Sequence, residues 1–150
     1  MPAHELERVR RHTAVRVNQR IDATIAETIY RYAGRTEGAI AARLDELDRE
    51  WDVERLLEAH AATVALLGAG LATVNRRWLA VPIGVLGFLL LHATQGWCPP
   101  LPVFRRLGAR TRGEIEREKF ALRFLRGDFD QVRAPNGTLA VPRLLHALQG

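Results

Sequence analysis

Two histidines and one cysteine are the side chains of this sequence best suited to bind a metal ion or a cofactor. His60 and His92 lie within an otherwise apolar block, and Cys98 follows shortly after the second histidine. Imidazoles and thiolates bind zinc, iron and haem, and ionisable groups at membrane depth are often functional. Two histidines are too few for a closed zinc site, so we keep the three residues as candidates and expect no cofactor.

The apolar block around the histidines is almost free of charge. Arg76 and Arg77 are the only charged residues between Ala59 and Phe104. A bilayer selects for such segregation. A buried hairpin in a soluble bundle is the alternative, but its helices would normally keep one polar stripe, and the second half of this block is apolar on all sides except at His92. The sequence therefore predicts an all-α integral membrane protein.

The block resolves into a two-helix transmembrane hairpin over 59–98. The first helix is predicted at about 59–74 and the second at about 78–97, so they have 16 and 20 residues. A span needs about 20 residues, so the first helix is short unless preceding residues also enter the bilayer. Antiparallel pairing would place His60 and His92 at nearly the same depth, near one membrane surface.

Two sets of residues are predicted to hold the hairpin in place. Tryptophans and arginines at its ends favour the membrane interface, and small residues let two helices approach closely. The expected interface residues are Trp78, Trp97, Arg105, Arg106, Arg110 and Arg112, and the expected packing residues are Ala65, Gly68, Ala69, Ala72, Gly84 and Gly87.

The distribution of arginine predicts orientation and source. Eight arginines lie within 20 residues of the two outer ends of the block, against two in its loop, so both termini are expected in the cytoplasm. One lysine beside 21 arginines indicates a GC-rich genome, which favours the bacterial inner membrane. The net charge is +5, but residues 1–58 carry −2 and the positive excess follows the hairpin. We therefore expect the lipid bilayer, a second copy of the chain or a cytoplasmic protein as partners, and no nucleic acid.

The segment 1–58 is predicted to form a cytoplasmic helical arm. Helices are expected at about 13–33, capped by Thr13, and at 36–51, beginning at Thr36. Each has an apolar stripe at helical spacing, and the short connection favours direct packing of stripe on stripe. The stripes are Val17, Ile21, Ile25, Ile29 and Tyr32 in the first helix, and Ile40, Leu44, Leu47 and Trp51 in the second. The first membrane helix can begin as a new helix capped by Asp52, or it can continue the second helix of the arm without a break, and the sequence leaves both alternatives open.

The segment 99–127 follows the hairpin as a basic juxtamembrane stretch with one amphipathic helix. Prolines at 99, 100 and 102 argue against regular helix there, and Thr111 can cap a helix over 113–126. Its apolar side is expected to carry Ile115, Leu122, Leu125, Phe120 and Phe124, with the charged half at the surface. The segment 128–150 is predicted to be a flexible tail, with a turn at 135–137 and a short helix at 142–148.

The residues at 95–108, Gln-Gly-Trp-Cys-Pro-Pro-Leu-Pro-Val-Phe-Arg-Arg-Leu-Gly, carry a resemblance to a known family. They resemble the end of the YgaP-like inner-membrane hairpin family, a domain of unknown function in which two short transmembrane helices finish in Gly-aromatic-Cys-Pro and a Leu-Gly pair follows. The resemblance covers about residues 59–111 and implies an inner-membrane hairpin. Some relatives carry a rhodanese domain that acts through a loop cysteine, but this chain has neither that domain nor a second cysteine, so sulfur transfer is not implied.

The sequence favours a non-enzymatic interaction or self-association module, because no catalytic constellation is found. The alternative is a membrane redox, metal or haem protein that uses His60 and His92 with Cys98. Cys98 is open to two interpretations, either a small packing residue between Trp97 and Pro99 or an interfacial thiol that reacts or binds a metal.

Overall fold

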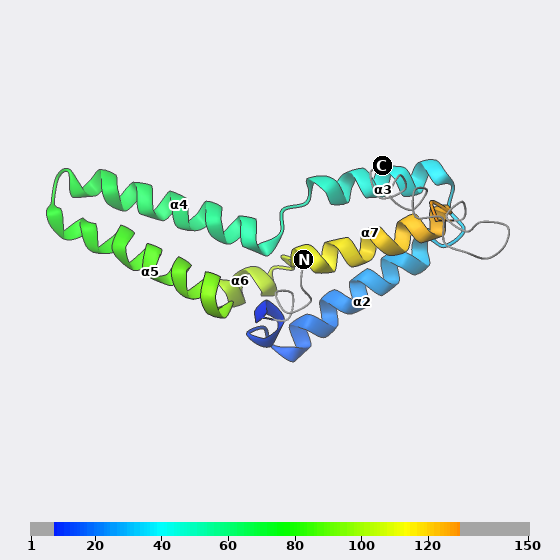
Figure 1. Cartoon of the computed structure of the whole chain (residues 1–150), viewed down its shortest axis with the longest axis horizontal. Helices are drawn as coiled ribbons and strands as arrows, with labels where there is room; N and C mark the ends of the chain where they lie inside the picture. Colours follow the sequence, from blue (N-terminus) through cyan, green and yellow to red (C-terminus); the bar gives the residue numbers. More distant parts are fainter. Residues whose placement is uncertain (1–7, 130–150) are drawn as a thin grey trace. The chain divides into compact units, whose positions relative to one another are not determined.

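The computed structural model describes residues 8–129, and every regular element in this range is a helix (Figure 1). The all-α fold class is therefore confirmed for this part of the chain. The elements are α2 Val15–Tyr32, α3 Glu37–Arg49, α4 Val53–Ala72, the 3₁₀ helix η1 Arg76–Leu79, α5 Ala80–Gln95, α6 Leu101–Arg106 and α7 Arg112–Arg126. The turn predicted at 135–137 and the helix predicted at 142–148 lie outside the described residues.

The chain divides into two compact units, and neither is continuous in sequence. Unit 1 comprises Met1–Ala23 and Trp51–Ile115, and unit 2 comprises Thr24–Glu50 and Glu116–Gly150. The helices α2 and α7 each contribute one part to each unit. This division differs from the predicted arm, hairpin, juxtamembrane segment and tail, whose boundaries followed the order of the sequence.

The helix ends follow local signals. Thr36 caps α3 by accepting from the Ala39 amide at 3.4 Å, and Asp52 caps α4 by accepting from the Arg55 amide at 2.8 Å. A break at 50–52 therefore separates α3 from α4. Thr13 is not the cap of α2, because the helix begins at Val15 and the Thr13 hydroxyl donates to the Val9 carbonyl at 2.7 Å and accepts from Arg105.

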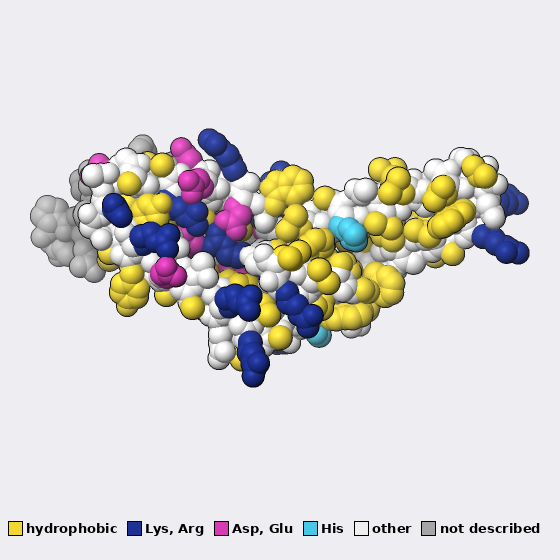
Figure 2. Space-filling view, turned by 180° about the vertical axis from the view of Figure 1, so that it is seen from behind, with side chains coloured by type: hydrophobic (Ala, Val, Ile, Leu, Met, Phe, Trp, Pro, Cys, Tyr) yellow, Lys and Arg dark blue, Asp and Glu magenta, His cyan; other side chains and the backbone are white. Residues whose placement is uncertain are grey.

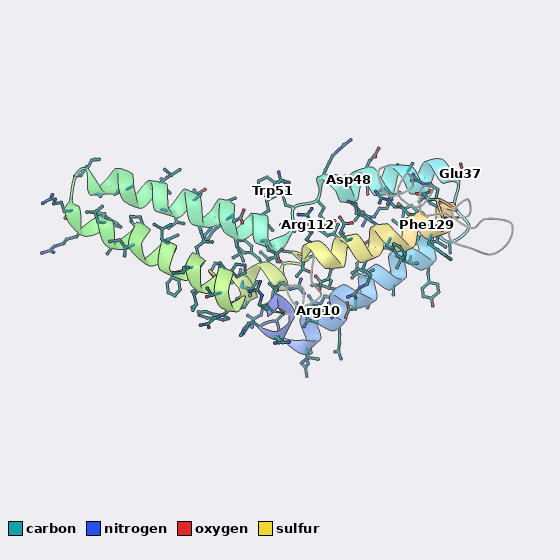
Figure 3. The ribbon with its side chains drawn as sticks, viewed as in Figure 1. Arg10, Glu37, Asp48, Trp51, Arg112 and Phe129 are labelled. Atoms are coloured by element: carbon teal, nitrogen blue, oxygen red, sulfur yellow. The ribbon has the colours of Figure 1, made fainter. Side chains whose placement is uncertain are left out.

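In unit 2, α3 and α7 are joined by ion pairs. Arg43 pairs with the buried Glu118 at 2.9 Å, and Lys119 pairs with Asp48, which is labelled in Figure 3. Stripe residues of both predicted helices are buried, among them Ile25, Leu44 and Leu47. The helix α7, distant in sequence, adds Glu118 and Leu122 to the buried residues, and direct packing of one stripe on the other stays a prediction.

The buried face of α7 also differs from the predicted one. Glu118 and Leu122 are fully buried, whereas Phe120 and Phe124 are more than half exposed. The expectation that the charged half lies at the surface is wrong for Glu118, because Arg43 neutralises it. Trp51, expected in the α3 stripe, lies beyond the helix and is exposed.

In unit 1, α4 and α5 form an antiparallel hairpin closed by η1 (Figure 1). The two helices approach closely at Gly68, because a Cβ atom there would lie 2.8 Å from Val81 and 2.9 Å from Pro82. Gly84 and Gly87, also predicted to pack, have nothing within 4 Å of a Cβ position. Of the other predicted packing residues, Ala65 and Ala72 are half-buried and Ala69 is exposed.

Among the described residues, one helical stretch is long and apolar enough to cross a membrane. It is Arg76–Gln95, which combines η1 and α5, and none of it is buried. The helix α4, which contains most of the first predicted span, is not apolar enough by the same measure. Its first two turns carry three charged residues, Glu54, Arg55 and Glu58.

The sequence suggested that the prolines after the hairpin prevent a helix, and this prediction is wrong. The helix α6 starts directly after Pro100 and has Pro102 in its first turn. A proline in the first turn removes an N–H that has no partner within the helix, so the prolines initiate α6 rather than exclude it.

Candidate functional site

The base of the hairpin is the best packed part of unit 1. Its buried residues come from the N-terminal segment, α4, the α5–α6 connection and the start of α6, and we call them the base core: Val9, Val53, Leu57, Cys98 and Leu101. The Val53 amide donates to the Arg110 carbonyl at 2.8 Å, which fixes the start of α4 to the loop before α7. Cys98 is 7% exposed, so its thiol serves as a core group in this structure.

A buried ion pair lies beside the base core. The guanidinium of Arg105 donates to both carboxylate oxygens of Glu114, at 2.6 and 2.8 Å. Its other donors reach the Ala109 carbonyl at 2.9 Å, Asn18 Oδ1 at 2.9 Å and Thr13 Oγ1 at 3.2 Å. The five N–H donors of an arginine are thus all used, which is what allows a charged side chain to be fully buried.

Glu114 has two further roles. It forms a reciprocal capping box with Thr111, whose amide donates to Glu114 Oε2 at 2.8 Å while Thr111 Oγ1 accepts from the Glu114 amide at 3.2 Å. Glu114 also accepts from Arg10 (labelled in Figure 3), which pairs with Asp22 at 2.7 Å as well. Burial alone would raise the pKa of Glu114, but hydrogen bonds and charge from Arg105 outweigh it and hold the pKa below its ordinary value.

A cavity of about 480 Å³ with both charged and apolar walls opens between α4, α5 and the N-terminal segment, and its lining residues are Arg8, Val9, Glu54, Glu58, Leu89, His92, Ala93 and Gly96. Two of its polar atoms, Glu54 Oε2 and His92 Nδ1, are buried and have no hydrogen-bond partner among the described residues. Burial is the main cause that raises the pKa of Glu54. Unpartnered buried polar atoms are uncommon and costly, which makes this cavity the leading candidate site.

The cavity wall requires a glycine at one position. Gly96 ends α5 with φ of 78°, a left-handed conformation that favours glycine, and a Cβ there would lie 2.6 Å from Arg8 Cβ. Arg8 in turn donates to the Ala93 carbonyl at 3.1 Å, which satisfies a backbone group at the end of α5. The glycine of the Gly-Trp-Cys-Pro stretch thus brings the N-terminal segment against the hairpin.

A second cavity, of about 130 Å³, is apolar and contains the other predicted histidine. It is lined by Leu57, His60, Ala61, Val64, Val85, Phe88, Leu89, Cys98, Pro99 and Pro100. The His60 ring meets the Phe104 ring edge-on, with centroids 5.8 Å apart. His60 is exposed, so its ring lines this cavity from the surface.

The structure does not bring the predicted metal ligands together. His60 and His92 line different cavities, and Cys98 shares a cavity with His60 alone. Within residues 8–129, no three His, Cys, Asp or Glu side chains are close enough to hold a metal ion. Equal depth along a hairpin, which the sequence predicted, does not place two side chains on the same side of it.

The predicted interface residues divide into two groups. Arg105 and Arg110 are buried, at 1% and 7% exposure, so their assignment to the membrane interface is wrong. The reason for Arg105 is its pairing with Glu114, a residue nine positions later. Arg106, Arg112 and Trp78 are exposed, and Trp97 is half-buried.

Sequence reasoning missed the Arg105–Glu114 pair and the cavity that contains Glu54 and His92. The spacing of Thr111 and Glu114 is the sequence signal of a capping box and could have indicated a fixed glutamate. The carboxylates of Glu54 and Glu58, one turn apart before the apolar run, could have indicated a shared face. The contribution of Arg8 has no local signal, because its contacts are 85 residues away.

No protein-family model, curated protein or solved structure matches this chain. The resemblance to the YgaP-like hairpin family therefore stays a prediction from the residues at 95–108.

Proposed function

We propose that the protein is anchored in a membrane by the α4–α5 hairpin and acts there as a non-enzymatic interaction or self-association module. The observation that carries the proposal is the exposure of large apolar side chains along the hairpin, between 45% and 87% for each of Leu66, Leu67, Leu71, Val74, Trp78, Leu79, Ile83, Leu86, Phe88 and Leu90. Figure 2 shows hydrophobic side chains over this hairpin and basic side chains at its end. Fully burying an exposed side chain of this kind contributes about 1.5–3 kcal/mol, and a half-exposed one contributes less, so hydrocarbon is the favourable surrounding.

The charges at the ends of the hairpin support an orientation for the proposal. Arg76 and Arg77 lie in η1, at the closed end, whereas Arg55, Arg106 and Arg112 are exposed around the base. Positive residues favour the cytoplasmic side, so the base and both termini are cytoplasmic in the inner membrane of a bacterium. The helix α5 spans the hydrocarbon with η1, and α4 enters it beyond Glu58.

Self-association has support from the open glycines of α5. Gly84 and Gly87 face no side chain of their own unit, and their neighbours Ile83, Leu86 and Leu90 are exposed. Close approach at small residues is a common way for membrane helices to associate. A second copy of the chain, meeting this face, is the partner that fits best.

Membrane extraction tests the anchor. The full chain should remain in the membrane fraction after alkaline carbonate washing, and Leu86→Arg should reduce that fraction because arginine costs about 2.5–3.5 kcal/mol at the centre of a span. Val15→Arg, at an exposed apolar position outside the hairpin, is the matched control and should leave the fraction unchanged. Release of the unmodified chain by carbonate would refute the anchor.

Chemical cross-linking of two copies in the membrane tests the dimer face. Loss of the cross-linked dimer in Gly84→Leu would support it.

A further inference from the structure

The short helix α6 buries one side and leaves the other side exposed. Leu101 and Arg105, which are four residues apart, are both buried. Val103 and Leu107, also four residues apart, are 55% and 78% exposed, and Arg106 beside them is exposed as well. Residues three and four positions apart share one side of a helix, so Val103, Arg106 and Leu107 form a single surface, which we call the α6 face.

The α6 face is held close to the end of the hairpin. The helix α6 begins at Leu101, six residues after α5 ends at Gln95. Leu101 also belongs to the base core together with Leu57 of α4. In the proposed anchor α4 enters the hydrocarbon beyond Glu58, directly after Leu57. The shared core therefore keeps α6 next to the cytoplasmic headgroup layer.

The chain around the α6 face is basic. Residues 99–113 contain four arginines and neither Asp nor Glu. The helix α6 is bonded to the start of α2, because Arg105 donates to Thr13 Oγ1 and to Asn18 Oδ1. Residues 8–21 add five arginines, again without Asp or Glu. Figure 2 shows basic side chains over α6 and the start of α2. An anionic surface is the partner that this charge complements.

We infer that the α6 face lies in the cytoplasmic headgroup layer and binds anionic phospholipid in preference to zwitterionic phospholipid. Arg106 pairs with the lipid phosphate, and Val103 and Leu107 reach the boundary between headgroups and acyl chains. Interfacial helices combine cationic and apolar side chains in this way. A nucleic acid would satisfy the arginine alone and would leave both apolar side chains in water. The inference rests on the proposed membrane anchor, which supplies the bilayer.

Native mass spectrometry of the full chain in detergent tests the lipid preference. With equal amounts of phosphatidylglycerol and phosphatidylcholine, we expect more phosphatidylglycerol to be bound. Arg106→Gln should lower the ratio of bound phosphatidylglycerol to phosphatidylcholine by about two- to fivefold, whereas Arg106→Lys, which keeps the charge, should preserve it. Arg35→Gln removes an exposed arginine of unit 2 and should leave the ratio unchanged. Equal binding of the two lipids, or an unchanged ratio in Arg106→Gln, would overturn the inference.

Fluorescence quenching in nanodiscs tests the depth of the α6 face and distinguishes it from the anchor. In a Cys98→Ser background, a fluorophore is attached to Leu107→Cys or to Leu86→Cys. Nitroxide near the lipid headgroup should quench the label at 107 more than nitroxide at the acyl-chain end does, and the label at 86 should show the reverse. Quenching at 86 without quenching at 107 would overturn the inference and leave the anchor standing, whereas an unquenched label at 86 would contradict the anchor itself.

A nucleic-acid partner gives a different result. Phosphatidylcholine nanodiscs that carry the full chain should not retain a fluorescent DNA duplex at physiological salt. Retention of the duplex that is lost in Arg106→Gln would assign the α6 face to nucleic acid and overturn the inference.

Discussion

The buried pair of Arg105 and Glu114 gives the strongest prediction of this structure for stability. Glu114→Gln keeps the size of the side chain but leaves the Arg105 guanidinium without its countercharge in a site where it is 1% exposed. Breaking one partner of a buried pair costs about 3–5 kcal/mol, whereas an exposed pair contributes about 0–1 kcal/mol. Because Arg10 retains Asp22 in the variant, we expect a loss of about 3 kcal/mol, at the lower end of that range.

The matched control and the double variant separate charge from packing. Arg106→Met removes the adjacent arginine of α6, which is exposed, and should change the unfolding free energy by less than about 0.5 kcal/mol. Arg105→Met combined with Glu114→Gln should cost less than the sum of the two single changes, by about 1–3 kcal/mol, because neither charge is then left alone.

Thermal unfolding followed by circular dichroism measures these differences. A loss of 3 kcal/mol corresponds to a decrease of about 6–12 °C in Tm for a chain of this size. The pKa of Glu114 is below its ordinary value of 4.5, so its contribution is complete above that pH and disappears as the pH falls through the folded pKa. A Glu114→Gln variant with an unchanged Tm, or additive effects in the double variant, would refute the interpretation of the pair.

Three further predictions follow from unit 1. Gly68→Ala should destabilise the hairpin by about 1–3 kcal/mol, because the added Cβ would meet Val81 at 2.8 Å. Gly70→Ala, with nothing within 4 Å of its Cβ, should not, and the unfolding free energy of both variants in detergent tests this. Glu54→Gln should raise stability at neutral pH, because burial raises the pKa of Glu54 in the folded protein. The unmodified chain therefore loses stability as the pH rises from 4.5 through that folded pKa, and the variant should not. A pH series of Tm values that parallels the unmodified chain would contradict this. Gly96→Ala should lower Tm, because residue 96 has a positive φ of 78° and the added Cβ would meet Arg8. An unchanged Tm would contradict the contact with Arg8.

Features set by neighbouring residues could be predicted from the sequence. The caps of Thr36 and Asp52 and the glycine end of α2 at Gly34, with φ of 85°, depend on residues within one turn. The separation of charge around Ala59 to Phe104 was equally visible, and most of this stretch lies in the α4–α5 hairpin, where many large apolar side chains are exposed. These signals are local, and no distant contact was needed to interpret them.

Features set by distant pairs could not be predicted. In the sequence, Arg105 is one of several arginines in a basic segment. Its burial depends on Glu114, Asn18 and Thr13 together. The insertion of α7 beside α3 depends on Arg43 and Glu118, which are 75 residues apart. The two histidines line different cavities for a related reason, because their positions in the hairpin give depth along the helices and not direction around them.

Cysteine labelling of intact spheroplasts tests the membrane hairpin most directly. In a Cys98→Ser background, single cysteines are placed in the loop (Asn75→Cys), in the apolar surface of α5 (Leu86→Cys) and on exposed α3 (Glu46→Cys), and treated with a membrane-impermeant maleimide. The proposed anchor predicts labelling of Asn75→Cys in intact spheroplasts, of Glu46→Cys after permeabilisation, and of Leu86→Cys after denaturation alone. Free labelling of Leu86→Cys under native conditions, or protection of Asn75→Cys from the outside, would contradict a hairpin that spans the bilayer with both termini in the cytoplasm.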